Sequence, residues 1–251
     1  MNWWESIILG IVQGITEWLP ISSDGHLVLF EKLRHLSVAV AFDVFLHLGS
    51  LVVILIFFRR EIIEFFKNLF KRSSVWPVEQ NKWWQYLIIS TIITGIIGLV
   101  FYPYIENYRN LDFTAYGFLL TSIIVFSSRW SKSGKNINYW IAILLGVVQG
   151  LAVLPGISRS GLVLSIALLS GVNRKQAFDY TFLMAIPAIA AAFILAAKDF
   201  VWQSIYLLGF MVTIIIGLMT LTLLRQIVNN NKFYLFSIYT LFLFFIIKFL
   251  I

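Results

Sequence analysis

The apolar positions of this chain fall into long runs that charged residues seldom interrupt. A helix needs about 20 predominantly apolar residues to cross the hydrocarbon core of a bilayer. Six runs meet that length and are predicted to be membrane-spanning helices. These are residues 40–58, 84–104, 112–130, 176–197, 202–224 and 233–250. The pattern therefore predicts an all-α polytopic membrane protein.

Two further apolar regions contain a polar interruption rich in Gly, Ser and Pro. Residues 3–34 are interrupted at 19–26, and residues 138–171 are interrupted at 154–161. Pro and Gly end a helix, and Ser or Asp caps the next one, so each half is too short to cross a bilayer by itself. We predict two re-entrant helix–loop–helix pairs. Such broken backbone is tolerated at membrane depth where protein or a watery cavity covers it.

The two interrupted regions are parts of a longer internal repeat. A shift of 136 residues aligns the chain with itself in one unbroken register over more than thirty residues. The shift places Gly10–Gly14 on Gly146–Gly150, Ile21-Ser22 on Ile157-Ser158, Gly25 on Gly161, and Ala41–Asp43 on Ala177–Asp179. We interpret the chain as a single membrane domain, 1–251, made of a first repeat, 1–136, and a second, 137–251. Each repeat holds one re-entrant pair and three spans, and because three is odd the two repeats are inverted.

Composition agrees with a membrane location and limits the partners. Hydrophobic residues make up 60% of the chain and charged residues 12%, against about 25% charged in soluble domains. Cysteine is absent, which excludes a disulfide framework and thiolate metal sites. The net charge of +7 could indicate a nucleic-acid partner. Basic cytoplasmic loops explain that charge in a membrane protein, so no nucleic acid is expected.

The positive charges predict the orientation of the chain. Thirteen of the nineteen Lys and Arg residues fall in one set of loops and five in the other, with Arg159 inside the second motif. The larger set is Arg59, Arg60, Lys67, Lys71, Arg72, Lys82, Arg129, Lys132, Lys135, Arg174, Lys175, Arg225 and Lys232. The smaller set is Lys32, Arg34, Arg109, Lys198 and Lys248. The positive-inside rule makes the larger set cytoplasmic, so the first re-entrant pair opens outward and the second inward.

Polar and ionisable side chains gather in the two motifs, at a depth where they are costly and by default mark function. The first motif holds Gln13, Glu17, Ser22, Ser23, Asp24 and His26, and the second holds Ser158, Arg159 and Ser160. Gln13 and Glu17 are four residues apart, so they lie on one face of a helix. Inverted repeats place a shared site near the midplane, between the broken helices.

The second motif is suited to phosphate. The Arg159 guanidinium matches phosphate oxygens better than a Lys would. Both interruptions also end at a helix N-terminus, where free N–H groups attract anions. Three glycines would let the backbone approach a ligand closely: Gly25, Gly156 and Gly161. Three serines fit two interpretations, as helix caps or as substrate ligands: Ser22, Ser158 and Ser160.

The first motif is suited to a divalent cation and to proton transfer. The Glu17 carboxylate, with Gln13 and Asp24, fits a phosphate site if Mg²⁺ or Ca²⁺ lies between. Mg²⁺ typically uses one or two carboxylates plus substrate phosphates. Ser23 and His26 supply a nucleophile and an acid or base, in either order.

A second pair of ionisable residues occurs near the start of a predicted span. Asp43 and His47 are four residues apart there, and Asp179 repeats the first of them. We favour a helix cap or an interfacial ion pair over a role in the site for these residues.

The motifs resemble those of one enzyme family. Residues 13–27, QGITEWLPISSDGHL, resemble the first signature of the undecaprenyl-diphosphate phosphatase family, usually written (E/Q)xxxE followed by PxSSxGH. Residues 155–161, PGISRSG, resemble the second signature, and residues 178–187, FDYTFLMAIP, resemble a segment that follows it. The resemblance covers essentially the whole chain. It implies a membrane enzyme that hydrolyses C55 isoprenyl diphosphate to the monophosphate, recycling the carrier lipid for envelope polymers.

The resemblance also implies residue roles. Glu17 and the residue at Gln13 belong to its metal and acid/base group. Ser23 and His26 are its candidate nucleophile and proton-transfer residues, and Arg159 holds the diphosphate. It further implies a plasma-membrane location with the site opening to the extracytoplasmic side, and an isoprenyl diphosphate lipid and the bilayer as partners.

This sequence departs from the family pattern at two positions. Gln13 stands where Glu is frequent, so one metal-binding carboxylate is missing, although the pattern admits Gln. Asp24 stands where Thr is common and would partly restore the charge. Isoprenoid length, source organism and oligomeric state stay open, with a homodimer among the options.

Two other function classes fit parts of the sequence. A secondary transporter or flippase of an isoprenyl phosphate lipid fits inverted repeats with broken helices, and it would move substrate without releasing phosphate. A non-catalytic scaffold or lipid-binding protein would tolerate mutation of the polar cluster. The Ser23 and His26 pair beside Arg159 favours an enzyme over these two classes, because binding alone needs no nucleophile.

Overall fold

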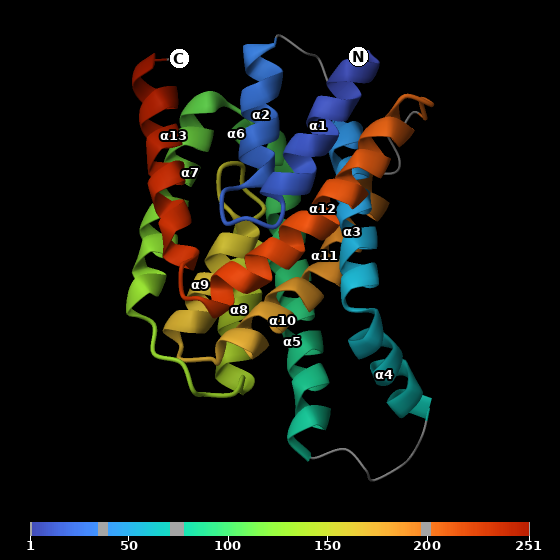
Figure 1. Ribbon diagram of the computed structural model, residues 1–251, viewed down its shortest axis with the longest axis vertical. Coiled ribbons are helices and arrows are strands. Elements are labelled where there is room, and N and C mark those ends of the chain that lie inside the picture. The colour runs from blue at the N-terminus through green and yellow to red at the C-terminus, as the bar shows by residue number, and fades with distance from the viewer. Residues whose placement is uncertain (1, 35–39, 71–77, 197–201, 251) are drawn as a thin grey trace.

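The computed structural model describes residues 2–34, 40–70, 78–196 and 202–250, folded almost entirely as helices (Figure 1). The elements are α1 (Trp3–Thr16), α2 (Ser23–Leu33), α3 (Val40–Phe57), α4 (Arg59–Phe70), α5 (Val78–Phe101), η1 (Tyr102–Tyr104), α6 (Ile105–Tyr108), α7 (Leu111–Ser127), η2 (Ser128–Trp130), α8 (Tyr139–Leu151), α9 (Arg159–Leu169), α10 (Arg174–Leu183), α11 (Ala185–Ala196), α12 (Tyr206–Asn229), η4 (Phe233–Leu235) and α13 (Phe236–Leu250). The predicted all-α class is confirmed.

Five helical segments among the described residues are long and apolar enough to cross a membrane. They are Trp83–Tyr104, Leu111–Trp130, Arg174–Leu195, Tyr206–Asn229 and Phe233–Leu250. Five of the six predicted spans are thereby confirmed. The other prediction, 40–58, corresponds to a shorter apolar helix, Phe42–Phe57, within α3. The chain is therefore a polytopic membrane protein.

Both predicted interruptions are present as breaks between helices. The first helix of the chain ends at Thr16 and the next begins at Ser23. In the second region α8 ends at Leu151 and α9 begins at Arg159. Each break leaves a short loop whose backbone lacks the full set of helical hydrogen bonds, so other parts of the protein must supply the missing partners.

A further break divides the predicted span 176–197. Helix α10 ends at Leu183 and α11 begins at Ala185. Pro187 accounts for it, because proline has no N–H to donate to the carbonyl of Leu183, one turn earlier. The prediction of a single helix over residues 176–197 is therefore corrected in this detail.

The outward faces of the spans are apolar. On α5 the side chains of Ile88, Ile92 and Ile96 lie one turn apart and are 55%, 56% and 60% exposed. A continuous apolar stripe of this kind would be a liability in water, but it is the expected surface of a helix in lipid. These exposures support the membrane location.

Helices α1 and α8 pack on α12 and α5 through equivalent contacts. The Thr213 hydroxyl of α12 donates to the Gly10 carbonyl of α1 at 3.2 Å. The Thr94 hydroxyl of α5 donates to the Gly146 carbonyl of α8 at 3.0 Å. Gly10 and Gly146 are the positions that the shift of 136 residues superposes. Each first half of a broken pair is therefore held by a span from the other half of the chain.

Both chain ends lie at one end of the molecule, and α4 projects from the opposite end (Figure 1). Helix α4 carries three cations of the larger basic set: Arg59, Arg60 and Lys67. The loop after α6, which carries Arg109, lies at the end with the termini. Three other cations in the orientation prediction lie outside the described residues: Lys71, Arg72 and Lys198.

Candidate active site

The two loops left by the helix breaks, 17–22 and 152–158, come together inside the helix bundle (Figure 1). The Ser160 hydroxyl, at the start of α9, donates to the Leu19 carbonyl of the first loop at 3.2 Å. The two polar motifs, more than 130 residues apart in sequence, therefore form one cluster.

Helix α7 anchors the second loop from the side. The Thr121 hydroxyl donates to the Gly156 carbonyl at 3.1 Å and accepts from the Ser158 N–H at 2.9 Å. One buried side chain thus satisfies two backbone groups that the broken helix leaves without partners. This bonding explains how an irregular loop is stable at membrane depth.

Two of the predicted serines cap the second helix of each pair. Ser22 Oγ accepts from the Gly25 N–H at 3.2 Å, and Ser158 Oγ accepts from the Gly161 N–H at 3.1 Å. The cap interpretation therefore applies to both. Ser22 has a positive φ of 67°, which costs about 1–3 kcal/mol in a residue other than glycine. This strain lies directly beside Ser23.

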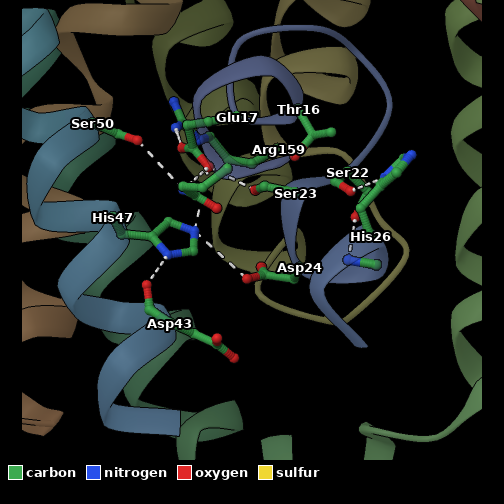
Figure 2. Close-up of polar contacts among 12 residues, drawn as sticks. Thr16, Glu17, Ser22, Ser23, Asp24, His26, Asp43, His47, Ser50 and Arg159 are labelled. Carbon is green, nitrogen blue, oxygen red and sulfur yellow. Dashed lines mark hydrogen bonds and ion pairs between the residues drawn. The ribbon is translucent and has the colours of Figure 1, made fainter. Parts of the chain in front are cut away.

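Glu17 is the centre of the cluster (Figure 2). Its side chain is 5% exposed, and donors surround both carboxylate oxygens. Oε1 accepts from Nη2 of Arg159. Oε2 accepts from the Ser23 hydroxyl at 2.6 Å and from Gln13 Nε2 at 3.2 Å, and it lies 3.3 Å from His47 Nε2.

Arg159 keeps one donor group unused. Its Nη2 atom is paired with Glu17, whereas Nη1 is buried and has no hydrogen-bond partner among the described residues. An unsatisfied guanidinium nitrogen in the protein interior is costly. It would be satisfied by an anionic oxygen of a ligand, and phosphate is the best geometric match.

His26 has a different set of partners from Ser23. Its Nδ1 atom is 2.7 Å from the Ser22 carbonyl oxygen, which can only accept, so Nδ1 carries the hydrogen. Its Nε2 atom is 2.9 Å from the Tyr239 hydroxyl, on α13. The sequence predicts that Ser23 and His26 act together in proton transfer. In the structure the Ser23 hydroxyl instead donates to Glu17.

His47 belongs to the cluster, so the interpretation of the pair as a cap or an interfacial ion pair is wrong for His47, whereas Asp43 does form an ion pair, with Arg109 at 2.8 Å. The Nε2 atom of His47 lies 3.3 Å from Glu17, and one helical turn further on, Ser50 Oγ accepts from Gln13 Nε2 at 3.3 Å. A signal for this was present in the sequence. Asp43, His47 and Ser50 are spaced i, i+4 and i+7, which puts three polar residues on one face of an apolar span.

Two of the predicted glycines serve packing between elements. A Cβ on Gly25 would lie 2.7 Å from Cζ of Phe118, on α7. Gly156 has a φ of +81°, and a Cβ there would lie 2.2 Å from the Thr114 carbonyl oxygen. The role of these glycines that the structure shows is the close contact of α2 and of the second loop with α7. Their predicted approach to a ligand stays a prediction.

The predicted Mg²⁺ or Ca²⁺ has few open ligands in this arrangement. Both Glu17 oxygens already accept hydrogen bonds, and among the described residues no three His, Asp or Glu side chains are grouped to hold a metal. The other two members of the predicted set can also contribute oxygens to a cation. Asp24 has a side chain that is 35% exposed, and Gln13 Oε1 is buried without a hydrogen-bond partner in the described structure. The metal site of Glu17, Gln13 and Asp24 stays a prediction.

A family model described as bacitracin resistance protein BacA matches residues 6–246. The chain belongs to the BacA family. The match spans both polar motifs and the helices that position them. The similarity to the BacA family therefore extends over the whole site and is not limited to one local motif.

Curated relatives of this BacA-family chain share one name. A protein of Thermosipho africanus is 39% identical over 237 residues, covering 93% of this chain and 94% of the relative. A protein of Methanosphaera stadtmanae is 37% identical over 257 residues, covering 94% and 93%. A protein of Korarchaeum cryptofilum is 32% identical over 246 residues, covering 94% of each chain. All three are named undecaprenyl-diphosphatase.

The residues predicted for the site differ in whether they contact Glu17 directly. Glu17 directly contacts Gln13, Ser23 and Arg159. Asp24 is linked to that group through His47, and His26 is turned toward Tyr239. No pattern in the sequence pointed to Tyr239, which lies on the last span, 213 residues after His26.

Proposed function

We propose that this protein is an integral membrane phosphatase that hydrolyses undecaprenyl diphosphate, or a related polyisoprenyl diphosphate, to the monophosphate and inorganic phosphate. The observation that carries the proposal is the contact of Ser23 with Glu17 beside the unsatisfied Nη1 of Arg159. A hydroxyl held by a carboxylate is an activated nucleophile. A guanidinium beside it stabilises the charge of a transferring phosphoryl group. The name of the curated relatives supports the substrate.

The first half of the reaction forms a phosphoserine. The terminal phosphate of the lipid diphosphate binds Nη1 of Arg159. Ser23 Oγ then attacks the terminal phosphorus, and its proton passes to Glu17 Oε2, which already accepts that hydrogen bond at 2.6 Å. The new O–P bond replaces the anhydride O–P bond, and the lipid monophosphate leaves with the electron pair of the broken bond.

The second half of the reaction releases phosphate. Water attacks the phosphoserine, a proton of the water passes to His26 Nε2, and the O–P bond to Ser23 breaks. Ser23 Oγ regains its proton from Glu17, and His26 gives its proton to the departing phosphate, which restores the starting state. Direct attack by His26, or by water that His26 activates, is an alternative that the same residues allow. A divalent cation held by Glu17, Gln13 and Asp24 would neutralise charge on the diphosphate.

The proposal includes inverted repeats and an outward-facing site. The equivalent bonds from Thr213 to Gly10 and from Thr94 to Gly146 support two related halves. The excess of basic residues at the end that carries α4 supports a cytoplasmic assignment of that end. The site would then open to the extracytoplasmic side of the plasma membrane. A single chain carries all of these groups, so the reaction does not require a homodimer.

Phosphate release from purified protein tests the proposal. The full chain in detergent or nanodiscs is given C55 and shorter isoprenyl diphosphates, with and without a chelator. We expect release by the wild type and a loss of at least about 100-fold in Glu17→Gln and Arg159→Ala. Arg129→Ala is the matched control, because Arg129 faces the Tyr234 ring at the other end of the bundle. Lipid movement across the membrane without phosphate release would favour a transporter and refute the proposal.

A further inference from the structure

His47 lies between the two sides of the first helix break, on the neighbouring helix α3 (Figure 2). Its Nε2 atom is 3.3 Å from Glu17 Oε2, just after α1, and 3.5 Å from Asp24 Oδ1, in the first turn of α2. The His47 side chain is 17% exposed, so these contacts are made largely out of water. The reaction described above does not use His47.

The other ring nitrogen fixes the orientation of the imidazole. His47 Nδ1 is 2.8 Å from the Asp43 carbonyl oxygen, one turn earlier in the helix. A carbonyl oxygen only accepts hydrogen bonds, so Nδ1 must donate. The carboxylate oxygens of Glu17 and Asp24 also only accept, so Nε2 donates toward them. A ring held at both nitrogens cannot rotate, and it sets the direction from which Glu17 is approached.

Asp43 is itself held in place. Arg109 Nη2 donates to Asp43 Oδ2 at 2.8 Å and to Glu31 Oε2, in the last turn of α2, at 3.0 Å. Burial works to lower the pKa of Arg109, but the carboxylates of Asp43 and Glu31 outweigh it and raise the pKa above its usual value. Helix α3 therefore contacts the first broken pair at two places. Arg109 joins Asp43 of α3 to Glu31 of α2, and His47 contacts Glu17 and Asp24 at the break.

We propose that His47 is a positioning residue for the hydrolysis, which keeps Glu17 Oε2 directed at the Ser23 hydroxyl. Glu17 is held from two sides, by Arg159 on Oε1 and by His47 on Oε2. Without His47, the guanidinium can take both carboxylate oxygens through Nε and Nη2 in a bidentate pair, a favourable Arg–carboxylate geometry that leaves Nη1 for phosphate. Oε2 would then turn away from Ser23. The inference rests on the proposed phosphatase function, because it concerns the proton of Ser23.

Three variants of the full chain test this role by steady-state phosphate release. His47→Leu keeps the volume and removes both N–H donors, and we expect kcat to fall about 10- to 100-fold. KM should stay within about threefold, because Arg159 still binds the phosphate. His47→Gln restores a side-chain N–H donor and should recover kcat to within about fivefold of the wild type. Thr213→Val removes a buried bond to Gly10 away from the reacting groups and should lower the melting temperature but not kcat.

Each contrary result has a definite meaning. A wild-type kcat in His47→Leu would refute the inference while leaving the phosphatase function intact. Equal losses of kcat in His47→Leu and Thr213→Val, or no recovery in His47→Gln, would show a merely structural role. Absence of phosphate release by the wild type would refute the proposed function and the inference with it.

Discussion

At the scale of single residues, hydrogen-bond direction assigns a distinct role to each nitrogen of His26. Nδ1 donates its hydrogen to the Ser22 carbonyl, so Nε2 carries a lone pair. That lone pair faces the Tyr239 hydroxyl, with 2.9 Å between Nε2 and the hydroxyl oxygen. The Tyr239 ring also stacks on the imidazole, with 5.7 Å between ring centroids and 9° between planes. Tyr239 therefore sets the orientation of the nitrogen that is free to exchange a proton.

Replacement of Tyr239 by Phe tests this orientation. The stacked ring remains and the hydroxyl is lost, so we expect the fold to be unchanged and kcat for phosphate release to fall about fivefold to tenfold, the equivalent of about 1 kcal/mol. The same substitution in a His26→Ala background should have no further effect on kcat. If Tyr239→Phe lowers kcat by the same factor in both backgrounds, the hydroxyl acts independently of His26.

Some site residues could be predicted and others could not, for physical reasons. Glu17 and Arg159 are rare charges in apolar sequence, and the cost of burying them makes their importance visible without a structure. The bond from Ser23 to Glu17 could not be predicted, because it depends on the strained backbone at Ser22. Tyr239 resembles any aromatic residue of a lipid-facing span until the fold places it against His26.

At the scale of elements, the site depends on how closely the broken loops approach α7. The second loop turns at Gly156, where the backbone has a positive φ of 81° and an added Cβ would lie 2.2 Å from the Thr114 carbonyl. Thr121 of the same helix bonds to both sides of that turn. The shape of the loop is therefore set by its packing against α7. The position of Arg159, three residues after Gly156, depends on both.

Substitution of Gly156 by Ala should destabilise the protein strongly. The left-handed backbone strains any other residue, and the Cβ overlaps backbone of α7, so we expect a loss of roughly 3 kcal/mol. Gly98→Ala is the control, because nothing lies within 4 Å of a Cβ at that position of α5, and alanine favours a helix. Melting temperatures in detergent should fall for Gly156→Ala and stay equal or rise for Gly98→Ala. Equal stability of both variants would contradict the close approach.

Helices were easier to predict than their ends. Apolar length alone gave the five spans, because the bilayer imposes a minimum number of residues. Gly, Ser and Pro gave both breaks. The break before Pro187 could not be predicted. A proline in a membrane helix either ends the helix or bends it, and the packing of neighbouring helices determines the outcome. Helix α12 begins at Tyr206 and ends at Asn229, whereas the apolar run predicts residues 202–224.

At the scale of the whole molecule, the two broken loops meet inside the helix bundle, and basic residues are concentrated toward the end that carries α4. The loops at the end with α4 include Lys132 and Lys135, between η2 and α8. Positive residues remain on the cytoplasmic side during insertion. The first broken pair, which carries Glu17 and Ser23, would then be entered from outside the cell.

Single cysteines can test this orientation, because the chain contains no cysteine of its own. Tyr104 and Asn110 flank α6 at the end with the termini, whereas Lys132 and Asn231 lie in loops at the opposite end, and all four are exposed. In intact bacterial cells a membrane-impermeant maleimide should label Tyr104→Cys and Asn110→Cys. It should label Lys132→Cys and Asn231→Cys only after the membrane is opened. The reverse pattern would place the site on the cytoplasmic side, and equal labelling of all four in intact cells would indicate insertion in both orientations.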